Sequence, residues 1–214
     1  MRTKILLTAA AAMAAGVVAS SAQVYSANVV GYYNVTVPAN QFVLTGNQLV
    51  NSTSNDLNTL VSSLPNKSTA ETWTGSGFAS SAKGSGGWVP DSTIAVGQGF
   101  FVITPASAGT VSNTFVGAVV VNTGASVTNT YAGSSFSLIA SPIPYATDLN
   151  DTNNTLNTST LPNKTTIEIW NGSGFTSSAK GSGGWVPDEN IAVGQGFFVE
   201  PPAAGATLIQ TLQP

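Results

Sequence analysis

The sequence predicts an all-β protein made of two tandem antiparallel units, sandwich-like or barrel-like, with one short helix at least in the first unit. Three observations support this fold class. One block of sequence occurs twice, short runs of β-branched and aromatic residues alternate with Gly, Pro and Asn, and charged residues make up only 7% of the 214 residues. Runs punctuated in this way are typical of strands that are separated by turns.

The internal duplication is the strongest of these observations. Residues 64–102 and 161–199 are identical at 32 of 39 positions and lie 97 residues apart. Upstream the match is weaker, and Phe42-Val43-Leu44 corresponds to Phe136-Ser137-Leu138 at an offset of 94. A tandem repeat of this length predicts one structural unit per copy.

The start of each copy sets the predicted domain boundaries. Val30-Gly31 and Val116-Gly117 are similar dipeptides, and we interpret them as the openings of the first and second copies. This interpretation gives one β-rich repeat unit at residues 23–115 and a second at residues 116–214.

Each copy contains several short predicted strands. Pro38-Ala39-Asn40 predicts a turn, Gly75-Ser76-Gly77 predicts a hairpin, and Gly97 and Gly99 predict a bulge. Beyond Gly99, apolar residues fall on both faces, which predicts a strand that is buried on both sides. In the first copy the predicted strands cover residues 29–37, 41–49, 69–74, 78–82 and 93–104.

One helix is predicted ahead of the repeated block. Ser54 can act as its N-terminal cap. The second copy keeps only Leu156 and Leu161 as apolar positions in this region, so the pattern leaves open whether an equivalent helix forms there. In the first copy the apolar residues follow at the spacing of one helix face and are Leu57, Leu60, Val61 and Leu64.

Four of the differences between the copies alternate along one strand. Successive strand residues point to opposite faces, so one face of this strand is shared by the two copies and the other is changed. On the changed face Ile167 and Ile169 replace Ala70 and Thr72. We therefore expect the changed face of the second copy to contact the first copy, with drift after duplication as the alternative.

The first residues are typical of a cleavable export signal. Arg2 and Lys4 precede an apolar stretch, and Ala19-Ser20-Ser21-Ala22 supplies small residues for cleavage. A membrane anchor is disfavoured because the apolar stretch is short for a bilayer of about 30 Å. We expect residues 1–22 to be removed as a signal peptide. The exported chain would then be extracellular, on the cell surface or periplasmic, with no transmembrane span.

Composition excludes several classes of function. The chain has no Cys and no His, so it lacks disulfides, a thiolate nucleophile, the usual general base and the usual transition-metal ligand. After signal removal four lysines stand against nine acidic residues, a formal charge of −5. Because this leaves no basic surface for phosphates, no nucleic-acid partner is expected. No cofactor, metal site or catalytic residue is predicted.

The candidate binding residues all lie in the duplicated block. A Trp on a Gly-rich loop can present a flat ring to a sugar, with Glu nearby as a hydrogen-bond partner. The competing interpretation is that these rings fill the core of each unit. The candidate glycan-binding residues are Glu71, Trp73 and Trp88 in the first copy and Glu168, Trp170 and Trp185 in the second.

Two further patterns point to chemistry less specifically. The stretch from Asp148 to Asn153 is rich in oxygen ligands, but it lacks the Gly and Glu of a calcium loop, so a polar loop is expected. Acid pairs could serve a glycoside hydrolase, although a duplicated site argues against this. The pairs are Glu71 with Asp91, and Glu168 with Asp188 or Glu189.

Several segments match a known pattern of exported proteins. Val30-Gly31-Tyr32, Phe136 to Ile143 and Val96 to Val102 carry it. On these residues the chain resembles a group of uncharacterised secreted bacterial tandem-repeat β proteins, whose units open with Val-Gly-Tyr and close with Gly-Gln-Gly-Phe-Phe-Val. The resemblance implies an all-β fold and an exported location, and it brings no activity or site residues.

These observations lead to three functional hypotheses. The first is a secreted or cell-surface, non-enzymatic β-repeat protein with a structural or adhesive role, which assembles with itself by covering exposed sheet edges. The second is a carbohydrate-binding module with one weak aromatic site per repeat and an extracellular polysaccharide as partner. The third and least favoured is a glycoside hydrolase, because the chain is predicted not to be an enzyme.

Overall fold

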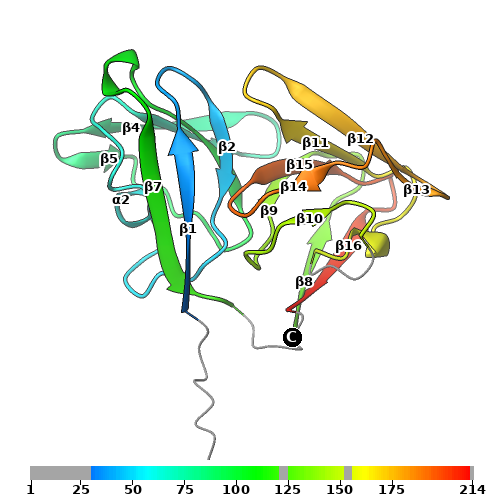
Figure 1. Ribbon diagram of the computed structural model, residues 1–214. Helices are drawn as coiled ribbons and strands as arrows, with labels where there is room; N and C mark the ends of the chain where they lie inside the picture. Colours follow the sequence, from blue (N-terminus) through cyan, green and yellow to red (C-terminus); the bar gives the residue numbers. More distant parts are fainter. Residues whose placement is uncertain (1–29, 121–124, 152–155, 213–214) are drawn as a thin grey trace, which may run out of the picture.

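A computed structural model describes residues 30–120, 125–151 and 156–212 of the chain, which form two β-rich units side by side (Figure 1). The predicted all-β class is confirmed. Every pairing between named strands is antiparallel, and helical structure in the described residues is limited to short segments. The predicted signal peptide lies outside these residues. No helix within them is long and apolar enough to cross a membrane.

The first unit packs a five-stranded sheet and a two-stranded ribbon around one core. Its elements are β1 (Val30–Val37), β2 (Val43–Gly46), α2 (Leu57–Leu60), β3 (Thr69–Trp73), β4 (Phe78–Gly84), β5 (Gly87–Val89), β6 (Gly99–Ile103), η1 (Ala106–Ala108) and β7 (Val111–Ala118). The sheet has the strand order β2-β6-β3-β4-β5, and the ribbon pairs β1 with β7.

The second unit repeats this arrangement. Its elements are β8 (Ser126–Tyr131), β9 (Ser137–Ala140), β10 (Thr147–Asp148), η2 (Thr158–Thr160), β11 (Thr166–Trp170), β12 (Phe175–Gly181), β13 (Gly184–Val186), β14 (Asn190–Ile191), β15 (Gly196–Glu200) and β16 (Ala206–Thr211). The sheet has the equivalent order β9-β15-β11-β12-β13, β8 pairs with β16, and β10 pairs with β14.

Alternation of buried and exposed side chains builds the core of the first unit. Along β1 the buried residues are Tyr33 and Val37, whose side chains share one face of the strand. Tyr33 stacks on Phe115 of β7 with ring centroids 4.8 Å apart. In β6 the first four residues are all buried, which confirms the predicted two-sided burial beyond Gly99.

The pairing of β7 moves the boundary between the units. Val116-Gly117 lies in β7, where Gly31 is the partner of Gly117, so this dipeptide closes the first unit and does not open the second. A division after residue 115 would cut β7, and the first described strand of the second unit is β8. Close packing explains the glycine, because a Cβ on Gly117 would lie 2.4 Å from the Val50 carbonyl oxygen.

The cap of the helix differs from expectation, whereas the predicted bulge is present. Asp56, rather than Ser54, caps α2, because its carboxylate accepts a hydrogen bond from the Thr59 backbone N–H at 2.8 Å. Ser54 instead donates to Asp56 at 2.5 Å. Gly97 has a φ of +86° and donates its N–H to the Asn47 carbonyl oxygen at 2.7 Å, while the Asn47 N–H donates to the Gln98 carbonyl oxygen at 3.0 Å. Gly97 and Gln98 therefore oppose the single residue Asn47, which is the glycine bulge predicted there. The second unit has the 3₁₀ segment η2 in this region.

A small apolar cluster joins the two units. It lies where β2 meets β15 and where β6 meets β9, in the middle of the molecule (Figure 1). Trp73 and Trp170 pack against it from the outside. The cluster contains one Leu and one Phe from each unit: Leu44, Phe101, Leu138 and Phe198.

Backbone hydrogen bonds across this junction come in equivalent pairs. The Gly46 N–H donates to the Gly194 carbonyl oxygen at 3.0 Å, and the Ala140 N–H donates to the Gly97 carbonyl oxygen at 2.9 Å. Gly46 corresponds to Ala140 at the offset of 94, and Gly97 corresponds to Gly194 at the offset of 97. The two units are therefore related by a pseudo-twofold axis, and the junction uses the same face of both.

The expectation that the changed strand face forms this junction was wrong. Ile167 and Ile169 are buried in the core of the second unit, and Ala70 is buried in the core of the first. The shared face makes the junction, through Trp73 and Trp170. A twofold contact requires the same shape from both copies, whereas each separate core can repack around its own residues.

Candidate functional site

A cluster of eight aromatic rings surrounds the junction and forms the candidate site, termed here the junction groove. Each position in it occurs twice, once in each unit. The rings are Phe42, Trp73, Phe78 and Phe101 from the first unit and Phe136, Trp170, Phe175 and Phe198 from the second.

Strand register places these side chains on one face. Trp73 is the partner of Phe78 across the β3–β4 hairpin, so the two rings lie on the same side of the sheet with centroids 5.0 Å apart. Glu71 is the partner of Phe101 in β6 and lies two residues before Trp73. It therefore shares this face. The second unit repeats the arrangement with its equivalent residues.

Each tryptophan of the groove is fixed by the opposite unit. The Trp73 indole N–H donates to the Phe136 carbonyl oxygen at 2.9 Å, and the Trp170 indole N–H donates to the Phe42 carbonyl oxygen at 2.8 Å. Both rings are half-buried. The hydrogen bonds hold the indoles in place while part of each ring stays open.

Four rings stand nearly perpendicular to Phe198. Trp73, Phe78, Phe136 and Phe175 make interplanar angles of 71° to 89° with it, at centroid distances of 5.4 to 6.4 Å. Phe198 is almost fully buried, so it forms a floor that the other rings surround.

The same arrangement is built around Phe101. Its four neighbours stand at 73° to 87°, with centroids 5.6 to 6.4 Å away. These neighbours are Phe42, Phe78, Trp170 and Phe175.

Two hollows open between these rings. The first, of about 320 Å³, is lined by Glu168 and by rings from both units: Trp73, Phe78, Phe136, Phe175 and Phe198. The second, of about 250 Å³, is lined by Glu71, Phe42, Phe78, Phe101 and Trp170. Each hollow is thus walled by aromatic rings from both units with one glutamate side chain beside them, and its exposed lining is almost entirely apolar. Neither unit has a complete hollow by itself.

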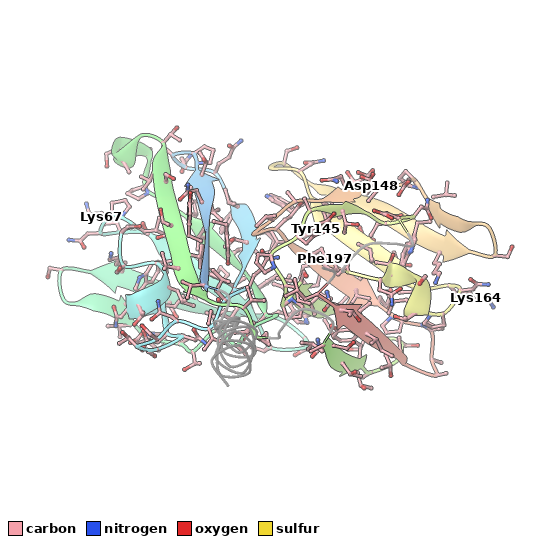
Figure 2. All side chains as sticks on the ribbon, turned by 60° about the horizontal axis from the view of Figure 1, so that its bottom comes forward. Lys67, Tyr145, Asp148, Lys164 and Phe197 are labelled. Atoms are coloured by element: carbon pink, nitrogen blue, oxygen red, sulfur yellow. The ribbon has the colours of Figure 1, made fainter. Side chains whose placement is uncertain are left out.

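None of the four lysines in the described residues is placed to neutralise the two carboxylates. Lys67 and Lys164 lie at opposite outer ends of the molecule (Figure 2). The Lys83 ammonium donates to the Ser62 and Leu64 carbonyl oxygens at 2.5 Å, and Lys180 makes equivalent bonds in the second unit. Burial lowers the pKa of Lys83 and of Lys180.

Trp88 and Trp185 are not part of the groove. They are only 2% and 3% exposed, and each belongs to the core of its unit, so neither ring face is open to a ligand. An asparagine fixes each loop. The Asn58 side-chain oxygen accepts a hydrogen bond from the Trp88 backbone N–H at 2.8 Å, and the Asn150 side-chain oxygen accepts one from the Trp185 backbone N–H at 2.7 Å. Trp88 and Trp185 are therefore core residues, and the prediction that their rings bind a glycan was wrong.

Neither hollow is lined by both members of a candidate acid pair, and Asp91, Asp188 and Glu189 are absent from both linings. Asp91 accepts a hydrogen bond from the Asn58 backbone N–H at 2.9 Å, and Asp188 accepts one from Asn150 at 2.9 Å. These carboxylates therefore support the buried tryptophan loops, whereas Glu71 and its equivalent line the groove. Each hollow is lined by a single acidic side chain.

In the described part of the oxygen-rich stretch before η2, the side chains make hydrogen bonds to other residues of the protein. The Asn150 amide donates to the Trp185 carbonyl oxygen at 2.9 Å, and Asp148 accepts from Asn190 at 2.9 Å. Asn153 lies outside the described residues. Across the parts of the chain that the structure describes, no group of three His, Cys, Asp or Glu residues could hold a metal ion.

Sequence reasoning found the two glutamates and the two tryptophans of the groove but missed its phenylalanines. Phe78 and Phe175 are 48% and 46% exposed, which is unusual for so large an apolar side chain. A signal was present, because each follows a Trp by five residues on the far side of a predicted hairpin. In such a hairpin the two positions are direct partners.

The chain matches no protein-family model, no curated protein and no solved structure.

Proposed function

We propose that this protein is an exported, non-enzymatic binding protein with an adhesive role, and that it acts through the junction groove. One observation carries the proposal. Eight aromatic rings gather on one face, and the outermost phenylalanines stay open to solvent. An exposed apolar patch rimmed by polar residues marks an interaction site on a soluble protein. The export-type first residues support the proposed location.

The edges of the two five-stranded sheets offer a weaker surface for adhesion than the groove. The inner edge strands β2 and β9 are each covered by the opposite unit of the same chain. The outer edge strands β5 and β13 are three residues long, and Pro90 and Pro187 follow them directly. Short edges followed by Pro discourage pairing between molecules. The adhesive role is therefore assigned to the groove.

The composition of the hollows supports a binding role over hydrolysis. Glycoside hydrolysis uses a pair of carboxyl groups on either side of the scissile bond. Each hollow is lined by only one acidic residue, Glu71 or Glu168, and the rest of its lining is aromatic.

Carbohydrate binding is the second candidate function. The half-buried Trp73 and Trp170, each beside a hollow that holds one glutamate, give one aromatic site per repeat. Sugars stack on such rings, but their hydroxyl groups also need hydrogen-bond partners. The lining supplies few polar atoms, so binding to a polysaccharide would be weak at each site and would depend on both sites together.

Adsorption of the mature chain to bacterial cell envelopes and to a panel of insoluble polysaccharides tests the proposal. The variant carries Phe78→Ser and Phe175→Ser. Its control carries Val89→Ser and Val186→Ser, which change equally duplicated residues that are 73% and 74% exposed and lie outside the groove. We expect the groove variant to lose adsorption and the control to keep it. Equal adsorption of both variants, with circular dichroism showing both folded, would contradict the proposal.

A further inference from the structure

We propose that a separate cleft between the two units, termed here the amide cleft, binds a neutral oligosaccharide. The cleft has a volume of about 370 Å³ and lies between β1 and β2 of the first unit and two turns of the second, one after β11 and one before β15. The inference goes beyond the proposed function, because Phe78 and Phe175, the exposed rings of the junction groove, do not line this cleft.

Three side-chain amides supply the polar part of the lining. They belong to Asn34, Gln41 and Gln195. The Gln195 side-chain oxygen accepts a hydrogen bond from the Ala192 backbone N–H at 2.8 Å, and the Asn34 side-chain oxygen accepts one from the Thr114 hydroxyl at 2.6 Å. Each bond uses the amide oxygen, which fixes the side chain and leaves its NH₂ group as the donor.

The two walls of the cleft are held at a fixed separation. They meet at Gly194, which is buried, and a Cβ there would lie 2.8 Å from the Tyr33 ring and 3.1 Å from a Val35 methyl group. Gln41 reaches towards the opposite wall, because a Cβ built on Gly172 would lie 3.9 Å from its Nε2 atom. The polar groups are therefore positioned before a ligand arrives, which lowers the cost of binding.

Aromatic rings supply the apolar part of the lining. Trp170 is half-buried and lines both the amide cleft and the second hollow of the groove. Its indole N–H donates to the Phe42 carbonyl oxygen, which holds the ring at this boundary. The CH groups of a sugar pack against such a ring while the hydroxyl groups around its edge reach hydrogen-bond partners.

The combination of these groups gives the class of ligand. None of the described residues that line the cleft is charged, so no side chain would neutralise an ionic ligand as it leaves water. The exposed lining is polar and apolar in similar measure, and a purely apolar ligand would cover the amides without pairing them. An amide both donates and accepts hydrogen bonds, as a hydroxyl group does. A neutral sugar therefore matches both parts of the lining.

The duplication predicts a single site of this kind per chain. At the offset of 94 the second unit has Ser135 where the first has Gln41, so one amide of the cleft has no counterpart. Gln98 is the counterpart of Gln195 and makes the same turn, since its side-chain oxygen accepts from the Ala95 backbone N–H at 2.9 Å. Gln98 does not line the amide cleft and is therefore a matched control.

Calorimetric titration of the mature chain with cellotetraose and with maltotetraose tests the inference, and the anionic tetragalacturonate is the comparison. We expect one bound molecule per chain for at least one neutral tetrasaccharide and no binding of the anion. Gln41→Leu and Gln195→Leu should each weaken binding about five- to tenfold, the effect of one lost hydrogen bond. Gln98→Leu, which breaks the same turn bond in the first unit, should bind as the unmodified chain does.

Four outcomes would overturn the inference. They are the absence of saturable binding of both neutral tetrasaccharides, binding that Gln41→Leu leaves unchanged, equal losses in Gln195→Leu and Gln98→Leu, and binding of an uncharged peptide of Gly, Ala and Ser in place of the sugars. The Phe78→Ser and Phe175→Ser double variant should keep its tetrasaccharide binding. If it lost adsorption while no tetrasaccharide bound the unmodified chain, the proposed function would stand and the amide cleft would fall.

Discussion

Gly46 and Ala140 occupy equivalent positions in the two units and face each other across the junction. A Cβ added to Gly46 would lie 2.1 Å from the Cβ of Ala140, closer than two carbon atoms can approach. The two residues end the inner edge strands β2 and β9, and each donates its backbone N–H to the opposite unit. The close approach of the two backbones therefore depends on one member of this pair having no side chain.

Replacing Gly46 with Ala should destabilise the whole chain. The new methyl group must displace Ala140 and with it the paired backbone hydrogen bonds, so we expect the free energy of unfolding to fall by about 1–3 kcal/mol. Urea denaturation measures this loss. Adding Ala140→Gly to the same chain should restore much of the stability. Gly77→Ala is the control, because nothing lies within 4 Å of a Cβ there, and equal losses at both sites would contradict the prediction.

Trp73→Phe and Trp170→Phe should have nearly equal effects. Each removes one indole hydrogen bond to the opposite unit, at 2.9 Å and 2.8 Å respectively. We expect each change to lower the free energy of unfolding by about 1 kcal/mol for the lost hydrogen bond, in addition to the effect of lost ring area. Thermal unfolding of the two variants checks this. A large difference between them would show that the pseudo-twofold relation does not extend to the energetics of the junction.

The two core tryptophans should behave unequally, although their surroundings are similar. The Trp88 indole N–H donates to the Val61 carbonyl oxygen at 3.3 Å, whereas the buried Trp185 indole N–H finds no hydrogen-bond partner among the described residues. Replacement by Phe breaks a bond in the first case and removes an unsatisfied donor in the second. We therefore expect Trp88→Phe to be more destabilising than Trp185→Phe by about 1 kcal/mol in urea denaturation. Equal losses would contradict this prediction.

Stability should fall at alkaline pH because of Tyr33. Burial raises the pKa of Tyr33 far above its usual value, and its hydroxyl donates to the Gly46 carbonyl oxygen at 2.6 Å. The folded chain holds this proton more tightly than the unfolded chain does. The contribution is therefore complete below the unfolded pKa of about 10 and is lost as the pH rises towards the higher folded pKa.

Urea denaturation at a series of pH values checks this dependence. Tyr33→Phe should be less stable at neutral pH, since it loses the hydroxyl bonds, but its stability should decline less steeply above about pH 10. Burial also raises the pKa of Tyr131, so Tyr131→Phe should flatten the same decline. Tyr145→Phe, at a half-exposed ring, is the control for the substitution itself. An unchanged slope in Tyr33→Phe would refute the assignment.

Local pattern predicted the strands well and their partners less well. Period-two burial and turn residues located β1 and the β3–β4 hairpin to within one or two residues. Val116-Gly117 was misassigned because similarity to Val30-Gly31 suggested a second opening, whereas the two dipeptides lie in paired strands. Strand pairing depends on distant contacts, which a single sequence does not display.

The sequence also does not show which of two equally suitable residues takes a given structural role. Ser54 and Asp56 are both good helix caps, and the structure uses Asp56 as the cap with Ser54 bonded to it. Trp73 and Trp88 are the same residue type in the same block, yet one lines the groove and the other fills the core. Trp73 lies on the strand face that meets the other unit, whereas Trp88 points into the core of its own unit. The difference depends on how the two units pack together, which the sequence of one block does not display.

The rings at the centre of the groove are shared between its two halves. Phe78 contacts both Phe101 and Phe198, and Phe175 does the same. If an occupant on one side shifts either ring, the shape offered on the other side changes too. The two equivalent sites are then thermodynamically linked, and a titration would yield two successive dissociation constants where independent sites would repeat one. The duplicated chain would respond as a single cooperative receptor.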